Sequence, residues 1–238
     1  MKSLKITTLV LLAAFLLVRC GSGAQKQPES ITISGAFALY PLAVKWAEEY
    51  KKLNPDLRID ISAGGAGKGL TDALSGAVTL GMFSRKIEQA EIDKGVWWVA
   101  VTKDAVLPVV SAKNPNVAAL KQKGVTQEQF KKIFITQEIK TWGELLGTKD
   151  ATKINVYTRS DASGAADSWA SYLGKKQENL IGTGVFGDPG LADAVSKDPN
   201  GIGYNNTIFA YDLKTGQKQS TLEVLPIDIN SNGSVEAE

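Results

Sequence analysis

The stretch of sequence that decides the fold is found at residues 31–50, which read ITISGAFALYPLAVKWAEEY. Residues 31–34 have the character of a short strand, and Gly35 ends it. Pro41 then stands in the first turn of a helix, a position that proline tolerates. The apolar residues that follow recur at helical spacing: Leu42, Trp46, Tyr50 and Leu53. The stretch therefore predicts a strand, a turn of small residues and a helix.

The same order continues further along the chain. Residues 58–62 alternate as a half-buried strand, residues 64–67 form a glycine-rich turn, and a helix is expected from Leu70. Residues 79–82 predict a third strand. Repeated units of strand, turn and helix favour a largely parallel α/β sheet, with ligands at the carboxyl ends of its strands.

The rest of the chain predicts further elements of both kinds. Strands are expected at residues 97–102, 105–112, 153–158, 201–204 and 221–225. Thr126 and Gln129 have the spacing of a capping box at the start of a helix, and a second helix is expected from Ser163 to Leu173. We expect the side chains of three tryptophans to lie in the core: Trp46, Trp97 and Trp98.

Composition narrows the class of protein. The chain has 238 residues, of which 43% are hydrophobic, enough for one large or two small packed domains. Its net charge of +2 gives no electrostatic reason to expect nucleic acid as a partner. The chain has no histidine and one cysteine, which excludes zinc sites, Ser-His-Asp triads and intramolecular disulfides. We expect neither an enzyme nor a cofactor or metal.

The N-terminus has the features of an export signal. Lys2 and Lys5 precede an apolar run at residues 9–18, which is too short for a membrane span of about 20 residues. We therefore expect residues 1–19 to be a signal peptide. Cys20 follows, and residues 17–20 resemble a bacterial lipobox, although Arg19 stands where a small residue is usual. We expect a lipid on Cys20, which would anchor the exported protein to the cell envelope, with residues 20–30 as its tether. An exported protein with a free thiol is the alternative.

Three segments share a design that suits an anion: residues 34–38, 64–69 and 159–165. Each follows a predicted strand, consists mostly of small residues and opens a helix, whose first N–H groups lack partners and carry partial positive charge. The last segment adds Arg159. Gly67 and Lys68 resemble the end of a phosphate-binding loop of NTPases, but Ser62 and Gly69 do not fit that motif. The three segments together predict a polyanion site and not a nucleotide site.

Taken in order, these segments resemble the bacterial phosphate-binding proteins that serve phosphate ABC importers. The similar segments cover much of the chain between residues 31 and 210: residues 35–50, 64–70, 76–85, 109–115, 125–134 with Trp142, 159–165 and 201–204. The resemblance implies a type II periplasmic-binding-protein fold, in which two α/β lobes, each a mixed sheet flanked by helices, are joined by two crossover strands. It implies that residues 31–107 and 205–238 form one lobe and residues 108–204 the other.

The resemblance also implies a function and a set of ligand residues. The function is capture of inorganic phosphate between the lobes by a monomer, which delivers it to the permease subunits of an ABC transporter. Backbone N–H groups would come from the loops at residues 34–38, 64–69 and 159–165, and the turn at residues 76–85 would supply Ser84. The last loop would add the Ser163 hydroxyl group and the Arg159 guanidinium group, which Asp161 would orient. The full set of ligand-binding residues is Ala36, Phe37, Ala38, Ala66, Gly67, Ser84, Arg159, Asp161, Ser163, Gly164 and Ala165.

The sequence departs from the family pattern at several of these positions. The family usually has hydroxyl side chains where this chain has Ala36 or Phe37, Ala66 and Ala165. Many members also have an aspartate near Ser84 that accepts the proton of hydrogen phosphate, and Arg85 follows here instead. Two alternatives therefore stay open with the same fold: a site for sulfate, tungstate or molybdate, or a sensor or scaffold with a degraded site. An exported enzyme acting on phosphate esters is a weaker third alternative.

Overall fold

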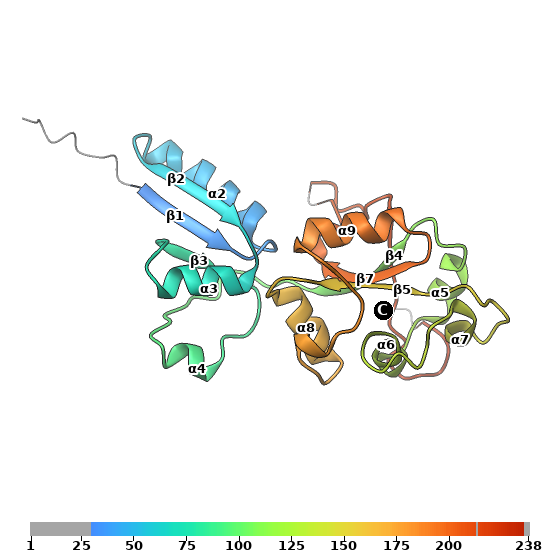
Figure 1. The fold of residues 1–238 in the computed structure, drawn as a ribbon. Helices are drawn as coiled ribbons and strands as arrows, with labels where there is room; N and C mark the ends of the chain where they lie inside the picture. Colours follow the sequence, from blue (N-terminus) through green and yellow to red (C-terminus); the bar gives the residue numbers. More distant parts are fainter. Residues whose placement is uncertain (1–29, 213, 236–238) are drawn as a thin grey trace, which may run out of the picture.

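The computed structural model describes residues 30–212 and 214–235 and contains two sheets with their own helices (Figure 1). The signal peptide, Cys20 and residues 20–29 of the expected tether lie outside the described residues. The α/β class and the division into two lobes are confirmed. Within the described residues, no helix has the length and apolar character needed to cross a membrane.

The first lobe is built from the three predicted strands. β1 (Ser30–Gly35), β2 (Arg58–Ala63) and β3 (Leu80–Met82) form a parallel sheet in the order β2-β1-β3. The helices of this lobe are α2 (Tyr40–Leu53), α3 (Ala66–Leu74) and the short α4 (Gln89–Ile92). Because the strands are parallel, the turns that follow them lie at one edge of the sheet, toward the second lobe (Figure 1).

The second lobe is larger and its sheet is mixed. Its strand order is β6-β5-β7-β4-β8, in which β5 is parallel to β6 and β7, and β4 is antiparallel to β7 and β8. The strands are β4 (Val106–Ser111), β5 (Asn155–Arg159), β6 (Thr183–Val185), β7 (Gly201–Asn206) and β8 (Leu222–Val224). The helices are α5 (Val117–Lys123), α6 (Gln127–Phe134), α7 (Trp142–Leu146), α8 (Gly164–Tyr172), η2 (Gln177–Asn179), α9 (Gly187–Lys197) and α10 (Thr207–Ala210).

An aromatic cluster holds the second lobe together. The ring centroid of Trp169, on α8, lies 5.0 Å from that of Phe130, 5.5 Å from that of Phe134 and 5.8 Å from that of Tyr204. α6 places both phenylalanines in this cluster, and it begins with the predicted capping box, in which Thr126 accepts a hydrogen bond from the Gln129 N–H. α8, α6 and β7 are therefore fixed to one another through large buried rings, which dominate the packing energy of a core.

The core of the first lobe is much smaller. Its buried apolar residues are Ala36, Ala43, Ala66 and Met82. Glycine allows this close packing: at Gly35, whose φ is +134°, an added Cβ would lie 2.2 Å from the Met82 carbonyl oxygen. Small residues therefore bring β1, α3 and β3 together in place of large side chains.

Two predictions about the first lobe were wrong. Residues 97–102 form no strand, and Trp97 and Trp98 are 83% and 53% exposed. Trp46 is 45% exposed, because α2 buries only Ala43 completely. Among the described residues, no strand pairs with the outer edge of β3, and no second layer of structure covers α2. The apolar side chains of residues 97–102 and of the outer face of α2 therefore stay exposed, although their spacing predicted burial.

The end of the chain also differs from the expected division into lobes. Residues 205–238 were expected in the first lobe, whereas β8 pairs with β4 in the second sheet. Leu222 and Leu225 are each 1% exposed and belong to core clusters of the second lobe. Burial of these side chains holds this segment beside β4. Residues 93–105 connect the two sheets.

The contrast between tryptophans gives a stability test. Trp169→Ala should lower the free energy of unfolding by about 3–5 kcal/mol, because it removes the centre of the aromatic cluster. Trp97→Ala should change it by no more than about 0.5 kcal/mol, because that side chain contributes little buried surface. Urea unfolding followed by circular dichroism measures both. Equal losses for the two variants would contradict the burial described here.

Candidate functional site

The turns at the carboxyl ends of the first three strands are bonded to one another. The Ala36 N–H donates to the Met82 carbonyl over 3.0 Å, which ties the turn after β1 to the end of β3. The Gly64 N–H donates to the Gly35 carbonyl over 2.9 Å, which ties in the turn after β2. These loops, in which the sequence predicted ligand residues, therefore form one connected edge of the first lobe.

The same edge contacts the turn that follows β5 in the second lobe. The Gly67 N–H donates to the Ala162 carbonyl over 3.1 Å. An added Cβ at Gly164 would lie 2.1 Å from the hydroxyl oxygen of Ser84, so the start of α8 packs directly against the turn after β3. The structure thus brings together all four predicted loops, and the loop after β5 contacts those after β2 and β3 across the lobes.

Arg159 lies at this junction with its side chain 1% exposed. Its Nε and Nη2 donate to the two carboxylate oxygens of Asp161 over 2.8 and 2.5 Å, so the carboxylate fixes the plane of the guanidinium group. The ring of Phe37, from the first lobe, has its centroid 5.5 Å from the Arg159 Cζ. A buried cation is therefore held by the second lobe and covered by an aromatic ring of the first.

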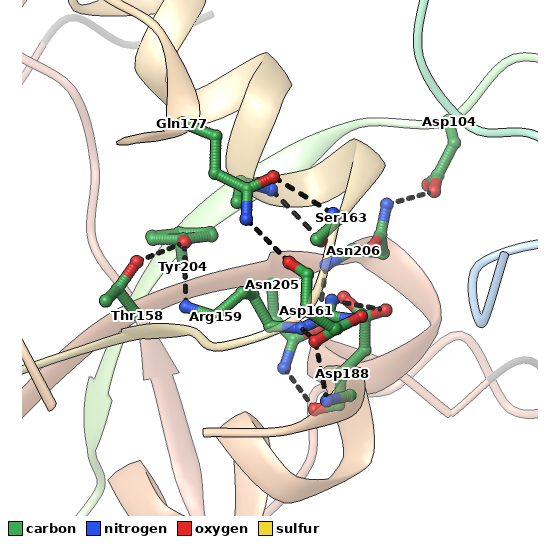
Figure 2. A network of polar contacts seen from close by, with 12 residues as sticks. Asp104, Thr158, Arg159, Asp161, Ser163, Gln177, Asp188, Tyr204, Asn205 and Asn206 are labelled. Carbon is green, nitrogen blue, oxygen red and sulfur yellow. Dashed lines mark hydrogen bonds and ion pairs between the residues drawn. The ribbon is translucent and has the colours of Figure 1, made fainter. Parts of the chain in front are cut away.

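Side-chain contacts fix the loop between Arg159 and α8, as Figure 2 shows. The Ser163 hydroxyl caps α8 by accepting from the Ala166 N–H over 3.2 Å. Gln177 accepts from the Ser163 N–H over 3.0 Å and donates to the Asp161 carbonyl over 2.6 Å. The Gln177 side chain thereby binds one backbone N–H group and one backbone carbonyl group of the loop, which restricts the movement of the residues next to Arg159.

Several predicted N–H donors are available and two are not. The Ala36 and Gly67 N–H groups are already bonded, as described above. Five others have no hydrogen-bond partner within the described residues: the N–H groups of Phe37, Ala38, Ala66, Gly164 and Ala165. They come from both lobes, and three of them lie in the first turns of α3 and α8, where the helix dipole favours an anion.

A second carboxylate, which was not predicted from the sequence, lies beside Arg159. Asp188 is 3% exposed, and its Oδ2 lies 2.8 Å from Arg159 Nη1. It belongs to the first turn of α9, just after β6, and the neighbouring Phe186 packs edge-on against Phe37 with ring centroids 5.7 Å apart. Residues 183–188 repeat the design of strand, turn and helix seen in the other three loops, so the same pattern could have identified them.

Burial alters the titration of two groups around Arg159. Burial raises the pKa of the Asp188 carboxyl above its usual range, and the charge of Arg159 opposes this rise. Burial also raises the pKa of Tyr204 to about 12, so its hydroxyl stays neutral. The oxygen of that hydroxyl lies 2.7 Å from Thr158 Oγ1 and accepts from the Arg159 N–H over 3.3 Å. Tyr204 therefore supports the strand that presents Arg159.

Two other cations near the loops are engaged elsewhere. Arg85 donates to Glu91 over 2.6 Å and lies over the Phe83 ring, and Lys68 is paired with Asp72 on α3. Within residues 30–212 and 214–235, no group of three or more His, Cys, Asp or Glu side chains is placed to hold a metal ion. The arrangement is suited to binding an anion through one guanidinium group and several backbone amides.

Sequence comparison places the chain among known proteins. Residues 22–237 match the PBP superfamily domain. The chain is 31% identical to the phosphate-binding protein PstS of Bacillus subtilis, over 94% of this chain and 76% of that protein. It is 30% identical to the PstS of Pseudomonas aeruginosa, over 72% of this chain and 56% of that protein. The chain thus spans just over half the length of the Pseudomonas relative.

A solved structure shows the same architecture. A phosphate ABC transporter substrate-binding protein from Clostridium perfringens, with phosphate bound, superposes with a TM-score of 0.73 at 28% identity, over 88% of this chain and 78% of that one. Together with the match over residues 22–237, this similarity assigns the protein to a family. The chain belongs to the PBP superfamily and, within it, to the family of bacterial phosphate-binding proteins.

Proposed function

We propose that this protein captures inorganic phosphate outside the cytoplasm and delivers it to the permease of an ABC importer. The observation that carries the proposal is the buried Arg159 guanidinium group at the contact of the two lobes, in loops whose N–H groups include several from each lobe without a hydrogen-bond partner in the described part of the chain. The Bacillus relative is a phosphate-binding protein and the Clostridium relative is the substrate-binding protein of a phosphate ABC transporter, which supports the same function.

The mechanism is binding without a chemical reaction. The amides of Phe37, Ala38 and Ala66 would contact the anion from the first lobe, and Gly164 and Ala165 from the second. Hydrogen bonds to a charged group contribute about 1.5–3 kcal/mol each, and a micromolar dissociation constant needs about 8 kcal/mol in total. An anion held by both lobes would favour their closed arrangement, because only that arrangement brings all donors together.

The alternative ligands share this donor set. Ala66 and Ala165 supply no hydroxyl groups, so the recognition expected of them is by their backbone N–H groups, and any tetrahedral oxyanion can accept hydrogen bonds from these. Isothermal titration calorimetry with phosphate, sulfate, molybdate and tungstate distinguishes them. Tight tungstate binding without phosphate binding would show that the ligand is tungstate and not phosphate.

The first prediction concerns the buried cation. Arg159→Ala should weaken phosphate binding by about tenfold or more, because a charged hydrogen-bond donor is lost. Arg159→Lys, which keeps the charge and loses the planar fork, should bind with intermediate affinity. Arg58→Ala is the matched control, because Arg58 is exposed and paired with Asp60 on β2. Calorimetry gives the affinities and near-ultraviolet circular dichroism checks the fold. Unchanged affinity in a folded Arg159→Ala variant would remove Arg159 from the site.

The second prediction concerns the contact between lobes. Gly164→Ala would place a Cβ 2.1 Å from the Ser84 hydroxyl oxygen, so the start of α8 and the turn after β3 must separate. Phosphate affinity should fall by about tenfold or more, since donors from the two lobes no longer converge. Gly190→Ala, in α9, is the control, because the added Cβ would meet only a Val185 methyl carbon, at 3.1 Å, and no backbone atom within 4 Å. Equal affinities for the two variants would mean that the contact does not shape the site.

The third prediction concerns attachment to the envelope. We propose that Cys20 is lipidated after cleavage of residues 1–19, because two acyl attachments together give stable membrane binding. Cys20→Ser should then move the protein from the membrane fraction to the soluble fraction. Immunoblots of fractionated cells measure this, with Ser22→Ala as the control for an unrelated change in the tether. Retention of Cys20→Ser in the membrane fraction would contradict the anchor.

A further inference from the structure

A large apolar side chain of the first lobe reaches the second lobe. Phe37 follows β1 and is half-buried, and its ring packs edge-on against the ring of Phe186, with centroids 5.7 Å apart and an interplanar angle of 84°. Phe186 precedes α9, whose start lies next to the turn after β1 (Figure 1). The other contacts described between the lobes join backbone groups and small side chains, so this aromatic pair adds an apolar contact that those do not provide.

The second lobe provides a fitted seat for the Phe37 ring. Gly187, whose φ is +74°, lies at the tip of the ring, because an added Cβ there would be 2.9 Å from Phe37 Cζ. The centroid of the same ring lies 5.5 Å from Arg159 Cζ. Phe186, Gly187 and Arg159 thus form the seat: the glycine leaves the space that the ring occupies, and the guanidinium group places a cation over the ring.

The seat is held in place before the ring arrives. The Gly187 N–H donates to Asp161 Oδ1 over 3.1 Å, and both oxygens of Asp161 accept hydrogen bonds from Arg159. Little conformational freedom is therefore lost in the second lobe when the ring packs there, so most of the contact energy is kept. Phe37 belongs to the first lobe and the whole seat to the second, so the contact exists only when the lobes are closed.

We propose that the Phe37 side chain is a latch that holds the lobes closed and thereby sets how long the bound oxyanion stays in the site. The inference rests on the proposed function, because the ion that is retained is the one captured at that site. It gives Phe37 two separate roles: its N–H group would contact the anion, and its ring would keep the lobes together. In the second role Phe37 is a positioning residue.

The latch acts on release more than on capture. A contact made only in the closed arrangement stabilises that arrangement relative to the open one. The anion enters while the lobes are apart and the seat is empty, so the ring contributes little to the rate of entry. Before the anion can leave, the ring must come out of the seat. Contacts at an interface in general change dissociation rates more than association rates.

The test compares phosphate release from the unchanged protein and from Phe37→Ala. Alanine keeps the backbone N–H group and removes the ring, so the dissociation rate constant should rise by about tenfold or more, while the association rate constant changes by less than about threefold. Phe37→Leu, which keeps part of the apolar side chain, should release phosphate at an intermediate rate. A fall in the association rate constant as large as the rise in release would mean that the turn itself is disturbed, which would overturn the latch.

Stopped-flow mixing of phosphate-loaded protein with an enzyme-coupled assay for free phosphate measures the release rate. The affinity from calorimetry then gives the association rate constant. Tyr50→Ala is the matched control, because it removes an aromatic side chain of the first lobe that is 49% exposed on α2 and far from the seat in sequence. Its two rate constants should equal those of the unchanged protein.

A double-variant cycle shows whether the ring acts through its seat. Phe186→Ala removes the opposing ring and leaves Phe37 and Arg159 in place. Because the two rings interact, the release rate of the variant with both substitutions should be about threefold or more below the rate obtained by multiplying the two single effects. Single effects that multiply without such a difference would show that Phe37 does not act through this contact, which would overturn the latch.

Closure can also be measured without a ligand. Small-angle X-ray scattering gives the radius of gyration, which should be larger for Phe37→Ala than for the unchanged protein, because the lobes of the variant separate more readily. If phosphate binds, the release rate decides, and an unchanged rate in Phe37→Ala overturns the latch while the proposed function stands. If phosphate does not bind, the proposed function fails and the radius of gyration decides: a larger value in Phe37→Ala supports the latch, and an equal value overturns it.

Discussion

The contact between Arg159 and its two carboxylates is the interaction on which the site depends. A guanidinium group with a side chain only 1% exposed cannot remain without partners, and Asp161 and Asp188 provide them from the loops after β5 and β6. Removing one partner of a buried ion pair typically costs about 3–5 kcal/mol, so these loops are held in place by charge as well as by packing. The same contact places the one buried cation of the described loops where amides from both lobes meet.

The two lobes contribute to this site in different ways. The second lobe has the aromatic core of Phe130, Phe134, Trp169 and Tyr204, and it holds Arg159 on a strand supported by Tyr204. The first lobe has a small core and contributes backbone groups from turns rich in glycine and alanine. The rigidly held Arg159 of the second lobe and the small, closely packed turns of the first lobe suit a ligand that is recognised by its charge and shape more than by particular side chains.

Much of this could be predicted from the sequence, because local patterns determined it. Strand, turn and helix in succession gave the parallel sheet of the first lobe, and the spacing of Thr126 and Gln129 gave the start of α6. The loops near Arg159 could be predicted because small residues at the start of a helix leave its unpaired N–H groups accessible to an anion. What failed was the inference from apolar spacing to burial, as Trp97 shows, since burial depends on whether another layer covers the segment. The pairing of β8 with β4 depends on contacts distant in sequence, so composition and period alone could not supply it.

The distribution of indole rings gives the protein natural optical reporters. Trp142 and Trp169 are buried in the second lobe, whereas Trp46, Trp97 and Trp98 are hydrated and belong to the first lobe or to the connection between the sheets. Indole emission shifts to longer wavelength as water surrounds the ring, so the blue part of the spectrum reports on the second lobe and the red part on the first lobe and the connection between the sheets. A soluble quencher that reaches only hydrated rings can therefore separate the two signals without an attached dye.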